Sequence, residues 1–302
     1  MAERHPEGRN PVGGYPPRKT RIVRTIKNLL KSCSTWLPSR RCELLLYEVL
    51  AVLERNAVRT NQILLAQTTP DFIFKLTSGP RLTNGKVAQL YVPDAGEDYI
   101  QTIIATRHDF FSIGALERTR KWVKPGTHMV DIGGHIGNHA IFWAGVVGAA
   151  RIYSFEPVAA TFAIQARNIA LNELGEVIRT FPLALGEKPG RGRVAIPDAQ
   201  NMGSVQILQD ARGECAVESL DALLAAGTFR ESPGISFAKI DVEGFESAVL
   251  RGGVNFFAHY KPVIQVEVFE RNRDAVFALL QSWGYRLVER SDDHDYVFVH
   301  GA

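Results

Sequence analysis

The chain has few cysteines, no long apolar run and little excess charge. Three cysteines stand among 302 residues, and no two of them have the CxxC spacing of a zinc or redox site. We therefore expect neither a disulfide framework nor a zinc site, and we expect a reducing, cytoplasmic compartment. No apolar run approaches the ~20 residues of a membrane-spanning helix, and the first residues lack the pattern of a secretory signal.

The net charge of +3 is unevenly placed. Residues 1–40 carry nine Lys or Arg and two Asp or Glu, a net of +7, so the rest of the chain carries −4. Residues 1–20, rich in Pro, Gly and charge, are predicted to form a disordered basic arm. Residues 21–32 have the pattern of a short basic amphipathic helix. We interpret it as docked on the body, with contact to an anionic membrane or to nucleic acid as the alternatives.

The rest of the chain divides into an extension over residues 21–95 and an α/β domain over residues 96–302. The extension is expected to contain a helix and a small β-hairpin, and the domain begins with a helical pattern. Strand and helix patterns then alternate, which predicts a parallel sheet with helices on both faces. The expected strands are 128–132, 150–156, 177–185, 235–241, 262–268, 285–290 and 296–300, the last two antiparallel; the expected helices are 41–66, 97–123, 137–148, 159–172, 244–251 and 274–283.

Residues 190–226 interrupt this alternation with short strand patterns and one helix. We interpret them as an insertion near the carboxyl ends of the parallel strands. Its polar turn, Asn201, Gly203 and Ser204, is either part of an acceptor pocket or a surface hairpin. Cys215 is interpreted as a small apolar filler.

The segment MVDIGGHIGNHAIF, residues 129–142, places Asp131 at the end of a strand and then Gly133, Gly134 and Gly137 in a short loop. Glycine permits close backbone approach, and the helix that follows offers unpaired N–H groups. A loop after the first strand of a parallel sheet lies where such sheets bind ligands. Ile132 stands where the dinucleotide fingerprint needs its first glycine, so a pyrophosphate ligand is disfavoured.

The next strand ends in SFEP, with Glu156 and Pro157. An acidic side chain at this place accepts hydrogen bonds from ribose hydroxyls. Together with Asp131 and the glycines, it fits S-adenosylmethionine, which carries a ribose and an ammonium group. The alternative is that these are ordinary turn glycines and a capping acid.

Residues 238–246 read AKIDVEGFE, with SLDALLA upstream and Glu267 in a later strand. With the glycine loop and FEP, this pattern resembles the FkbM family of S-adenosylmethionine-dependent methyltransferases. The resemblance implies a class I, Rossmann-like fold: a doubly wound, seven-stranded, mostly parallel sheet with one antiparallel strand. It also implies O-methylation of a hydroxyl on a sugar, glycoside or hydroxylated natural product.

Family members commonly have Ala-Asn where this chain has Gly134-His135, so His135 or Asn138 is expected to replace any contact that the Asn side chain makes. The expected cofactor-binding residues are Asp131, Gly133, Gly134, His135, Gly137, Asn138, Glu156, Pro157 and Asp241.

Three carboxylates are the candidate catalytic groups: Asp241, Glu243 and Glu267. In the favoured interpretation Asp241 contacts the cofactor ammonium or the substrate, and Glu243 or Glu267 is the general base. Alternatively, the carboxylates hold a divalent metal such as Mg²⁺, or Glu243 only caps the following helix. We do not favour a metal.

Lys239 is expected to pair with an acid in a structural role. His135 and His139 are four residues apart, and their alternatives are a metal pair, a base or cofactor contact by His135, or plain loop residues.

The sequence thus favours an S-adenosylmethionine-dependent O-methyltransferase with a small hydroxylated acceptor. An RNA methyltransferase that uses the basic head, and a non-catalytic binding protein with this fold, are the alternatives. The oligomeric state does not follow from the sequence.

Overall fold

The computed structural model describes residues 39–69, 71–195, 206–290 and 294–301. The chain divides into two compact units, residues 1–60 and residues 61–302. Helix α2 (Ser39–Thr68) begins in the first unit, and its side chains Val49, Val52 and Leu53 are exposed. The predicted arm and the helix over 21–32 lie outside the described residues, and the domain boundary at residue 95 stays a prediction. Among the helices that the structure describes, none has the length and apolarity to cross a membrane.

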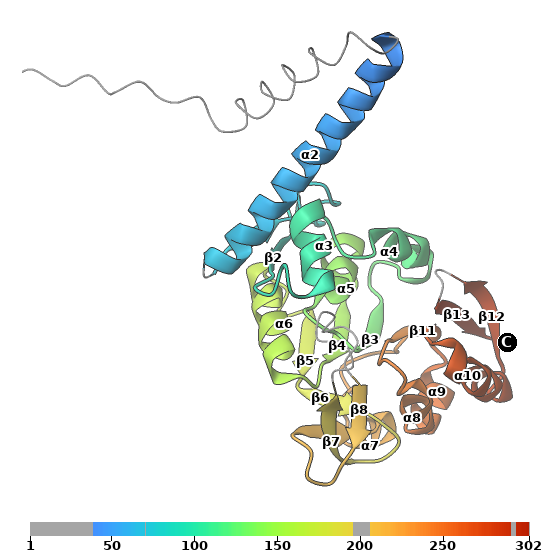
Figure 1. Ribbon diagram of the computed structural model, residues 1–302. Coiled ribbons are helices and arrows are strands. Elements are labelled where there is room, and N and C mark those ends of the chain that lie inside the picture. Colours follow the sequence, from blue (N-terminus) through green and yellow to red (C-terminus); the bar gives the residue numbers. More distant parts are fainter. Residues whose placement is uncertain (1–38, 70, 196–205, 291–293, 302) are drawn as a thin grey trace, which may run out of the picture. The chain divides into compact units, whose positions relative to one another are not determined.

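The second unit is built on a seven-stranded sheet with the order β12-β13-β11-β10-β3-β4-β5 (Figure 1). Strands β11, β10, β3, β4 and β5 are mutually parallel, and β13 is antiparallel to both of its neighbours. This confirms the predicted doubly wound fold with one antiparallel strand. The strands are β3 (His128–Ile132), β4 (Arg151–Phe155), β5 (Ile178–Phe181), β10 (Phe237–Ile240), β11 (Val263–Glu267), β12 (Tyr285–Arg290) and β13 (Asp295–His300).

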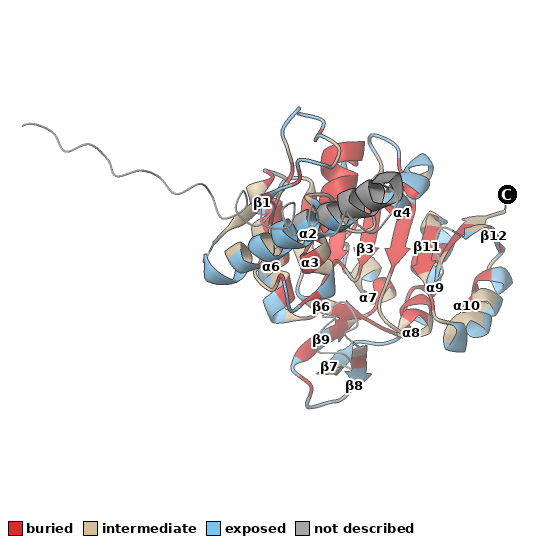
Figure 2. Cartoon of the chain, turned by 45° about the horizontal axis from the view of Figure 1, so that its top comes forward, coloured by how far each residue is buried: buried red, intermediate tan, exposed pale blue. Residues whose placement is uncertain are grey.

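Successive side chains of a strand point to opposite faces of the sheet. Alternate residues therefore pack into two separate cores, one on each face. Met129 of β3 faces a core with helices α3 (Tyr99–Arg107), α4 (Ile113–Thr119) and α6 (Ala159–Leu171). Its neighbour Val130 faces the other core, with α7 (Leu220–Ala225), α8 (Glu246–Arg251), α9 (Val254–Tyr260) and α10 (Glu270–Ser282). Figure 2 shows the central strands buried between exposed outer helix faces. The two helical layers thereby fix the strand ends that carry the site.

The helix after the glycine loop is not uniformly α-helical. Residues Asn138–Ile141 form α5, and Phe142–Val147 continue it as a π-helix that Gly148 ends in the left-handed conformation. Upstream, the expected helix over 97–123 is divided into α3, α4 and a 3₁₀ turn at Arg120–Trp122. The predicted hairpin is present as the antiparallel pair β1 (Ile73–Lys75) and β2 (Gln89–Tyr91).

The single strand predicted over 177–185 is wrong. Strand β5 ends at Phe181, and after Pro182 the chain enters β6 (Leu183–Leu185), which belongs to another sheet. A proline cannot donate to a strand ladder, so it separates the two strands. The second sheet has the order β6-β9-β7-β8, and its other strands are β7 (Gly190–Ala195), β8 (Gln206–Gln209) and β9 (Cys215–Glu218). Helix α9 was not predicted. The turn Asn201–Ser204 lies outside the described residues.

Candidate functional site

The glycine loop, residues 133–137, is tightly packed, and its conformation explains the glycines. Gly133 and Gly137 have φ of 86°. A Cβ on Gly133 would overlap the backbone oxygen of Asp241, and one on Gly134 would overlap Ser154 Oγ and Gln165 Nε2. Only a glycine backbone approaches its neighbours this closely without strain. The loop therefore lies directly against β10 and the polar groups beneath it.

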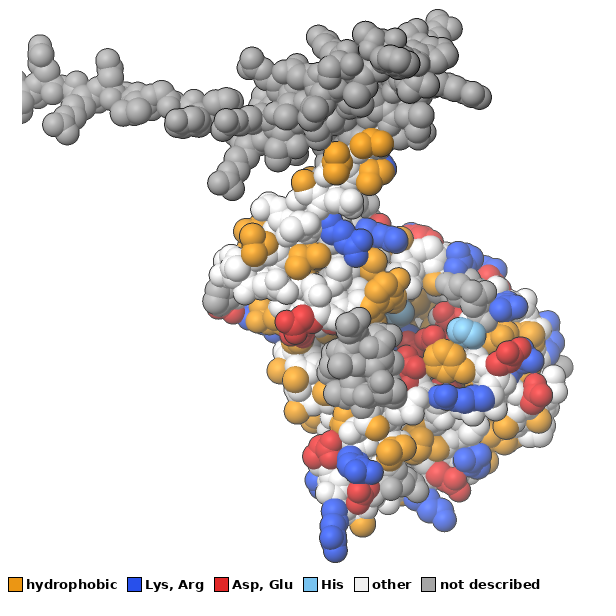
Figure 3. Space-filling view, in the orientation of Figure 1, with side chains coloured by type: hydrophobic (Ala, Val, Ile, Leu, Met, Phe, Trp, Pro, Cys, Tyr) orange, Lys and Arg blue, Asp and Glu red, His pale blue; other side chains and the backbone are white. Residues whose placement is uncertain are grey.

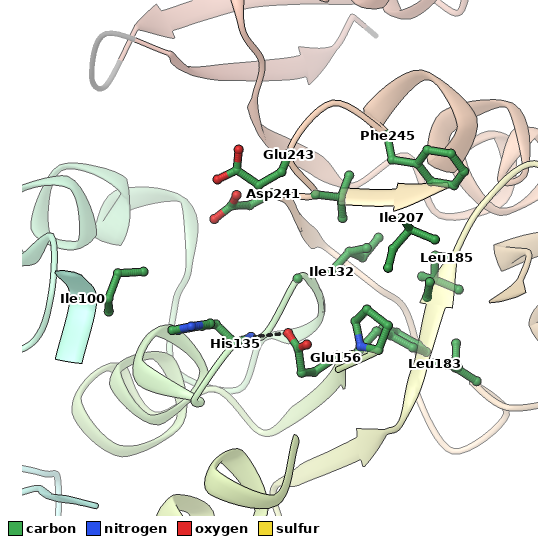
Figure 4. A pocket seen from close by; sticks show the side chains of 15 residues that line it. Ile100, Ile132, His135, Glu156, Leu183, Leu185, Ile207, Asp241, Glu243 and Phe245 are labelled. Atoms are coloured by element: carbon green, nitrogen blue, oxygen red, sulfur yellow. Dashed lines mark hydrogen bonds between the residues drawn. The ribbon is translucent and has the colours of Figure 1, made fainter. Parts of the chain in front are cut away.

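Next to the loop is a cavity, here called the loop cavity, which Figure 4 shows from close by. One side is polar, with His135, Glu156, Asp241 and Glu243. The opposite side is apolar and includes residues of β6 and β8 in the inserted sheet. The insertion thus borders the site, as predicted. The lining is completed by Ile100, Ile132, Gly133, Phe155, Pro157, Leu183, Ala184, Leu185, Ile207, Val242 and Phe245.

Glu156 lines the loop cavity and binds two backbone N–H groups beside it. Its Oε2 accepts from the backbone N–H of His135 at 2.9 Å, and its Oε1 accepts from that of Val158 at 2.9 Å. Burial raises the pKa of Glu156 to about 7, and the two N–H donors oppose that rise. Each oxygen keeps a lone pair for a further donor, so the carboxylate still suits the hydroxyls of a ribose.

A row of buried polar side chains crosses the sheet below the loop. Ser154, Asp131, Lys239 and Gln265 occupy neighbouring positions on β4, β3, β10 and β11. Lys239 Nζ lies 3.0 Å from the backbone oxygen of Gly133, 3.1 Å from Asp241 Oδ2 and 3.5 Å from Asp131 Oδ1. Ser154 Oγ donates to Asp131 Oδ2 at 3.0 Å and accepts from Gln165 at 3.1 Å. Lys239 thus pairs with acids, as predicted.

Asp131 is fully buried in this row and does not line the loop cavity. Burial raises its pKa, which Lys239 and Ser154 counteract. Asn138 is also turned away from the loop cavity, because its side-chain amide makes two hydrogen bonds with the backbone of Phe111. Of the expected cofactor residues, the structure brings Gly133, His135, Glu156, Pro157 and Asp241 together around the cavity, with Gly134 and Gly137 in the loop behind them.

The three candidate catalytic carboxylates converge at the ends of β10 and β11. A hydrogen bond joins Glu267 to Asp241, and the negative charge of Asp241, with burial, raises the pKa of Glu267 to about 10. The pKa of Asp241 is lowered by Lys239 against the effect of burial. Burial and the charge of Asp241 raise the pKa of Glu243 to about 7. Figure 4 shows the carboxylates of Asp241 and Glu243 side by side.

The capping interpretation of Glu243 is wrong. Helix α8 begins at Glu246 and not at Gly244, and its N-cap, Phe245, makes no side-chain capping bond. Glu246 itself accepts from the N–H of Gly244 at 2.6 Å. Glu243 has a φ of 53°, in the left-handed region that costs energy for residues other than glycine. The turn therefore holds the Glu243 side chain at the cavity rather than at the helix end.

One histidine, His135, lies in the glycine loop, and a second, His139, lies in α5. Burial lowers the pKa of His135, and it lowers the pKa of His139 to about 3, so His139 is neutral. The Nε2 atoms of both lack a hydrogen-bond partner in the described part of the chain. His135 lines the loop cavity and His139 does not. Among the residues described, no group of His, Cys, Asp and Glu has the arrangement of a metal site.

Sequence reasoning missed Ser154 and Gln265 of the polar row, and Gln165 of α6, which donates to Ser154. A polar residue inside an apolar strand pattern, as in YSF and IQV, was the available signal.

On the face drawn in Figure 3, acidic and histidine side chains gather around a hollow.

The loop cavity fits a nucleoside cofactor, because Glu156 keeps free lone pairs for ribose hydroxyls beside an apolar wall. The model of the FkbM methyltransferase domain matches residues 131–287, just over half of the chain. This chain belongs to the FkbM methyltransferase family. Its cofactor is S-adenosylmethionine, as predicted. That the glycine loop and Glu156 hold it stays a prediction.

Comparison with solved structures gives distant similarities. Methyltransferase FkbM from Methylobacillus flagellatus KT has 16% identity and a TM-score of 0.41; the match covers 68% of this chain but only 56% of that chain. Streptococcus pneumoniae Sp1610 in complex with S-adenosyl-L-methionine has 16% identity, a TM-score of 0.40 and coverages of 61% and 69%. Precorrin-6y C5,15-methyltransferase from Geobacter metallireducens GS-15 has 10% identity, a TM-score of 0.37 and coverages of 63% and 86%. No curated protein matches. Similarity at this level supports no inference about substrate.

Proposed function

We propose that this FkbM-family protein is an O-methyltransferase, which transfers a methyl group to a hydroxyl of a small acceptor. The observation that carries the proposal is the convergence of Glu243 and Glu267 on Asp241, which lines the loop cavity together with Glu243. When bound, S-adenosylmethionine supplies an electrophilic methyl group on a sulfonium. The protein then has to place a hydroxyl oxygen in line with it and remove one proton.

The three carboxylates suit different parts of this task. Glu267 carries a proton at neutral pH and donates it in the hydrogen bond to Asp241. Asp241 is ionised and its side chain is 26% exposed, so it can accept a hydrogen bond from the acceptor hydroxyl and orient it. Glu243 has a pKa of about 7, near the value that favours a general base at neutral pH. We assign the hydroxyl proton to Glu243, so that the products are a methyl ether and S-adenosylhomocysteine.

The test measures transfer of a labelled methyl group from S-adenosylmethionine to a panel of sugars, glycosides, catechols and a structured RNA. With the best acceptor, Glu243→Gln is expected to lower kcat by about 10²-fold or more, the usual contribution of a general base. The wild-type rate should rise with pH through about 7, the pKa of Glu243, because the base acts ionised. The variant should lose that rise.

The matched control is Glu176→Gln, the same change at an exposed glutamate outside the site. It should keep the wild-type rate and pH profile. Equal rates for Glu243→Gln and the control would reject Glu243 as the base. Transfer to the RNA alone would replace the small-acceptor proposal with RNA methylation, and cofactor binding without transfer to any acceptor would favour a non-catalytic binding protein.

A further inference from the structure

A second cavity lies on the other side of Asp241, and nothing in the cofactor assignment uses it. We call it the β11 cavity. It is formed by the start of α4, helix α5, the ends of β10 and β11, and the residues that lead into β13. Asp241 belongs to the lining of both cavities, whereas Glu243 lines the loop cavity and not the β11 cavity. Because the carboxylates of Asp241 and Glu243 lie side by side (Figure 4), a hydroxyl bound at the Asp241 end of the β11 cavity lies next to Glu243. Its lining includes Phe111, Leu116, His139, Gln265 and Glu267.

Gln265 brings an unsatisfied acceptor to this cavity. The residue is 5% exposed, and its Nε2 donates to Asp295 Oδ1 at 3.2 Å. Its Oε1 has no hydrogen-bond partner among the residues that the structure describes. A buried polar atom without a partner lowers the stability of the folded protein. A donor from a bound molecule would remove that destabilisation.

The remaining polar groups of the lining decide which ligand it suits. Asp241 is ionised. Glu267 keeps its proton and donates it in a hydrogen bond to Asp241. His139 is neutral, and its Nε2 also lacks a partner in the described chain. The one ammonium group of this lining, on Lys239, already contacts three oxygen atoms of Gly133, Asp131 and Asp241. Ser112 and His294, which can also donate, and Asp295 complete the polar part of the lining. With Gln265 Oε1 and the carboxylates of Asp241 and Asp295, acceptors outnumber these donors, and Asp241 adds negative charge.

We propose that the β11 cavity binds the methyl acceptor, and that this acceptor is a small neutral or cationic molecule with several hydrogen-bond donors and no anionic group. Polyols, amino sugars and amino-catechols have this chemistry. A phosphate or carboxylate would bring more acceptors and a charge of the same sign as Asp241. Phe111 and Leu116 provide an apolar wall for the carbon face of such a ring. This inference rests on the proposed function, because it presumes transfer to a hydroxyl.

The first experiment compares hydroxylated probes that differ only in charge. Glucose, glucosamine and glucose 6-phosphate form one set, and catechol, dopamine and 3,4-dihydroxybenzoate form the other. Label transfer from S-adenosylmethionine is measured at equal concentrations. We expect the neutral and cationic members of the productive set to be methylated at least about tenfold faster than the anionic member.

The second experiment tests the cavity itself with Gln265→Leu, which removes the unsatisfied oxygen. We expect the acceptor KM to rise at least about tenfold, while the Kd for S-adenosylmethionine, measured by calorimetry, stays within about twofold. Gln281→Leu is the control, because it is the same change at an exposed residue of α10. Circular dichroism establishes that both variants are folded.

The outcomes separate the two proposals. Transfer that favours the anionic probes, or an unchanged acceptor KM in Gln265→Leu, overturns the assignment of the β11 cavity and leaves O-methylation standing. Cofactor binding with no transfer to any probe overturns the proposed function and the inference with it.

Discussion

The buried cation Lys239 gives the strongest test of how the site is held together. Its Nζ contacts the loop through Gly133 and two carboxylates, Asp131 and Asp241, at 3.0 to 3.5 Å. Lys239→Met fills a similar volume but leaves the fully buried Asp131 without its cation. Removing one partner of a buried ion pair costs about 3–5 kcal/mol. We expect a loss of that size in the free energy of unfolding.

The double variant Asp131→Asn/Lys239→Met removes the stranded charge as well. We expect it to recover about 1–3 kcal/mol relative to Lys239→Met, the usual coupling of residues in one network. The assay is urea unfolding at pH 7.5, followed by tryptophan fluorescence. Lys188→Met, a change at an exposed lysine, is the control and should stay within about 0.5 kcal/mol of wild type.

The pH dependence of the same variant has a defined sign. Burial raises the folded-state pKa of Asp131 above its unfolded value, so its contribution to stability falls as the pH rises through these values. Loss of Lys239 raises that pKa further, so the penalty should be smaller at pH 5 than at pH 7.5. A penalty that does not change with pH, or a double variant no more stable than Lys239→Met, would refute the charge argument.

Four further predictions concern the cofactor, the reacting end and the glycine loop. Glu156→Ala should weaken S-adenosylmethionine binding by about 1–3 kcal/mol in calorimetry, because hydrogen bonds to a charged group are lost; unchanged affinity would reject the ribose contact. Wild-type affinity should also be lower at pH 6 than at pH 8, since protonation near pH 7 removes the Glu156 charge. Asp241→Asn should lower turnover much more than cofactor affinity, and wild-type turnover would show that the carboxylate has no essential chemical role. Gly134→Ala should cost about 1–3 kcal/mol of stability, measured by urea unfolding, because its Cβ overlaps Ser154 and Gln165.

The parallel sheet and the glycine loop were predictable because their signals are local. The strand patterns around β3, β4, β10 and β11 alternate with helical ones, and short connections in such a chain allow few topologies. The glycines of residues 133–137 were likewise visible as a cluster. Their physical cause was not, because the groups that exclude a side chain come from Ser154, Gln165 and Asp241, at least 17 residues further along the chain.

The electrostatics of the site could not be read from the sequence. Glu243 and Glu267 were equivalent candidates for the base, and only their packing separates them. Glu267 lies against Asp241 and holds a proton, whereas Glu243 has a pKa near neutrality. The end of β5 was missed for a related reason, because apolar residues stand on both sides of Pro182 and the partner strand of β6 is β9. Both the pKa difference between Glu243 and Glu267 and the end of β5 depend on contacts between segments that are distant in the sequence.

The buried polar row also restricts how the sheet can assemble. Ser154, Asp131, Lys239 and Gln265 are level with one another only in the native register. A slip of β10 by one residue would set Ala238 or Ile240 opposite Asp131 and turn the lysine toward the apolar core on the other face. Every misaligned sheet would then bury two unpaired charges, whereas the native one pairs them. The residues that build the site thus also select the correct alignment of strands that lie more than a hundred residues apart.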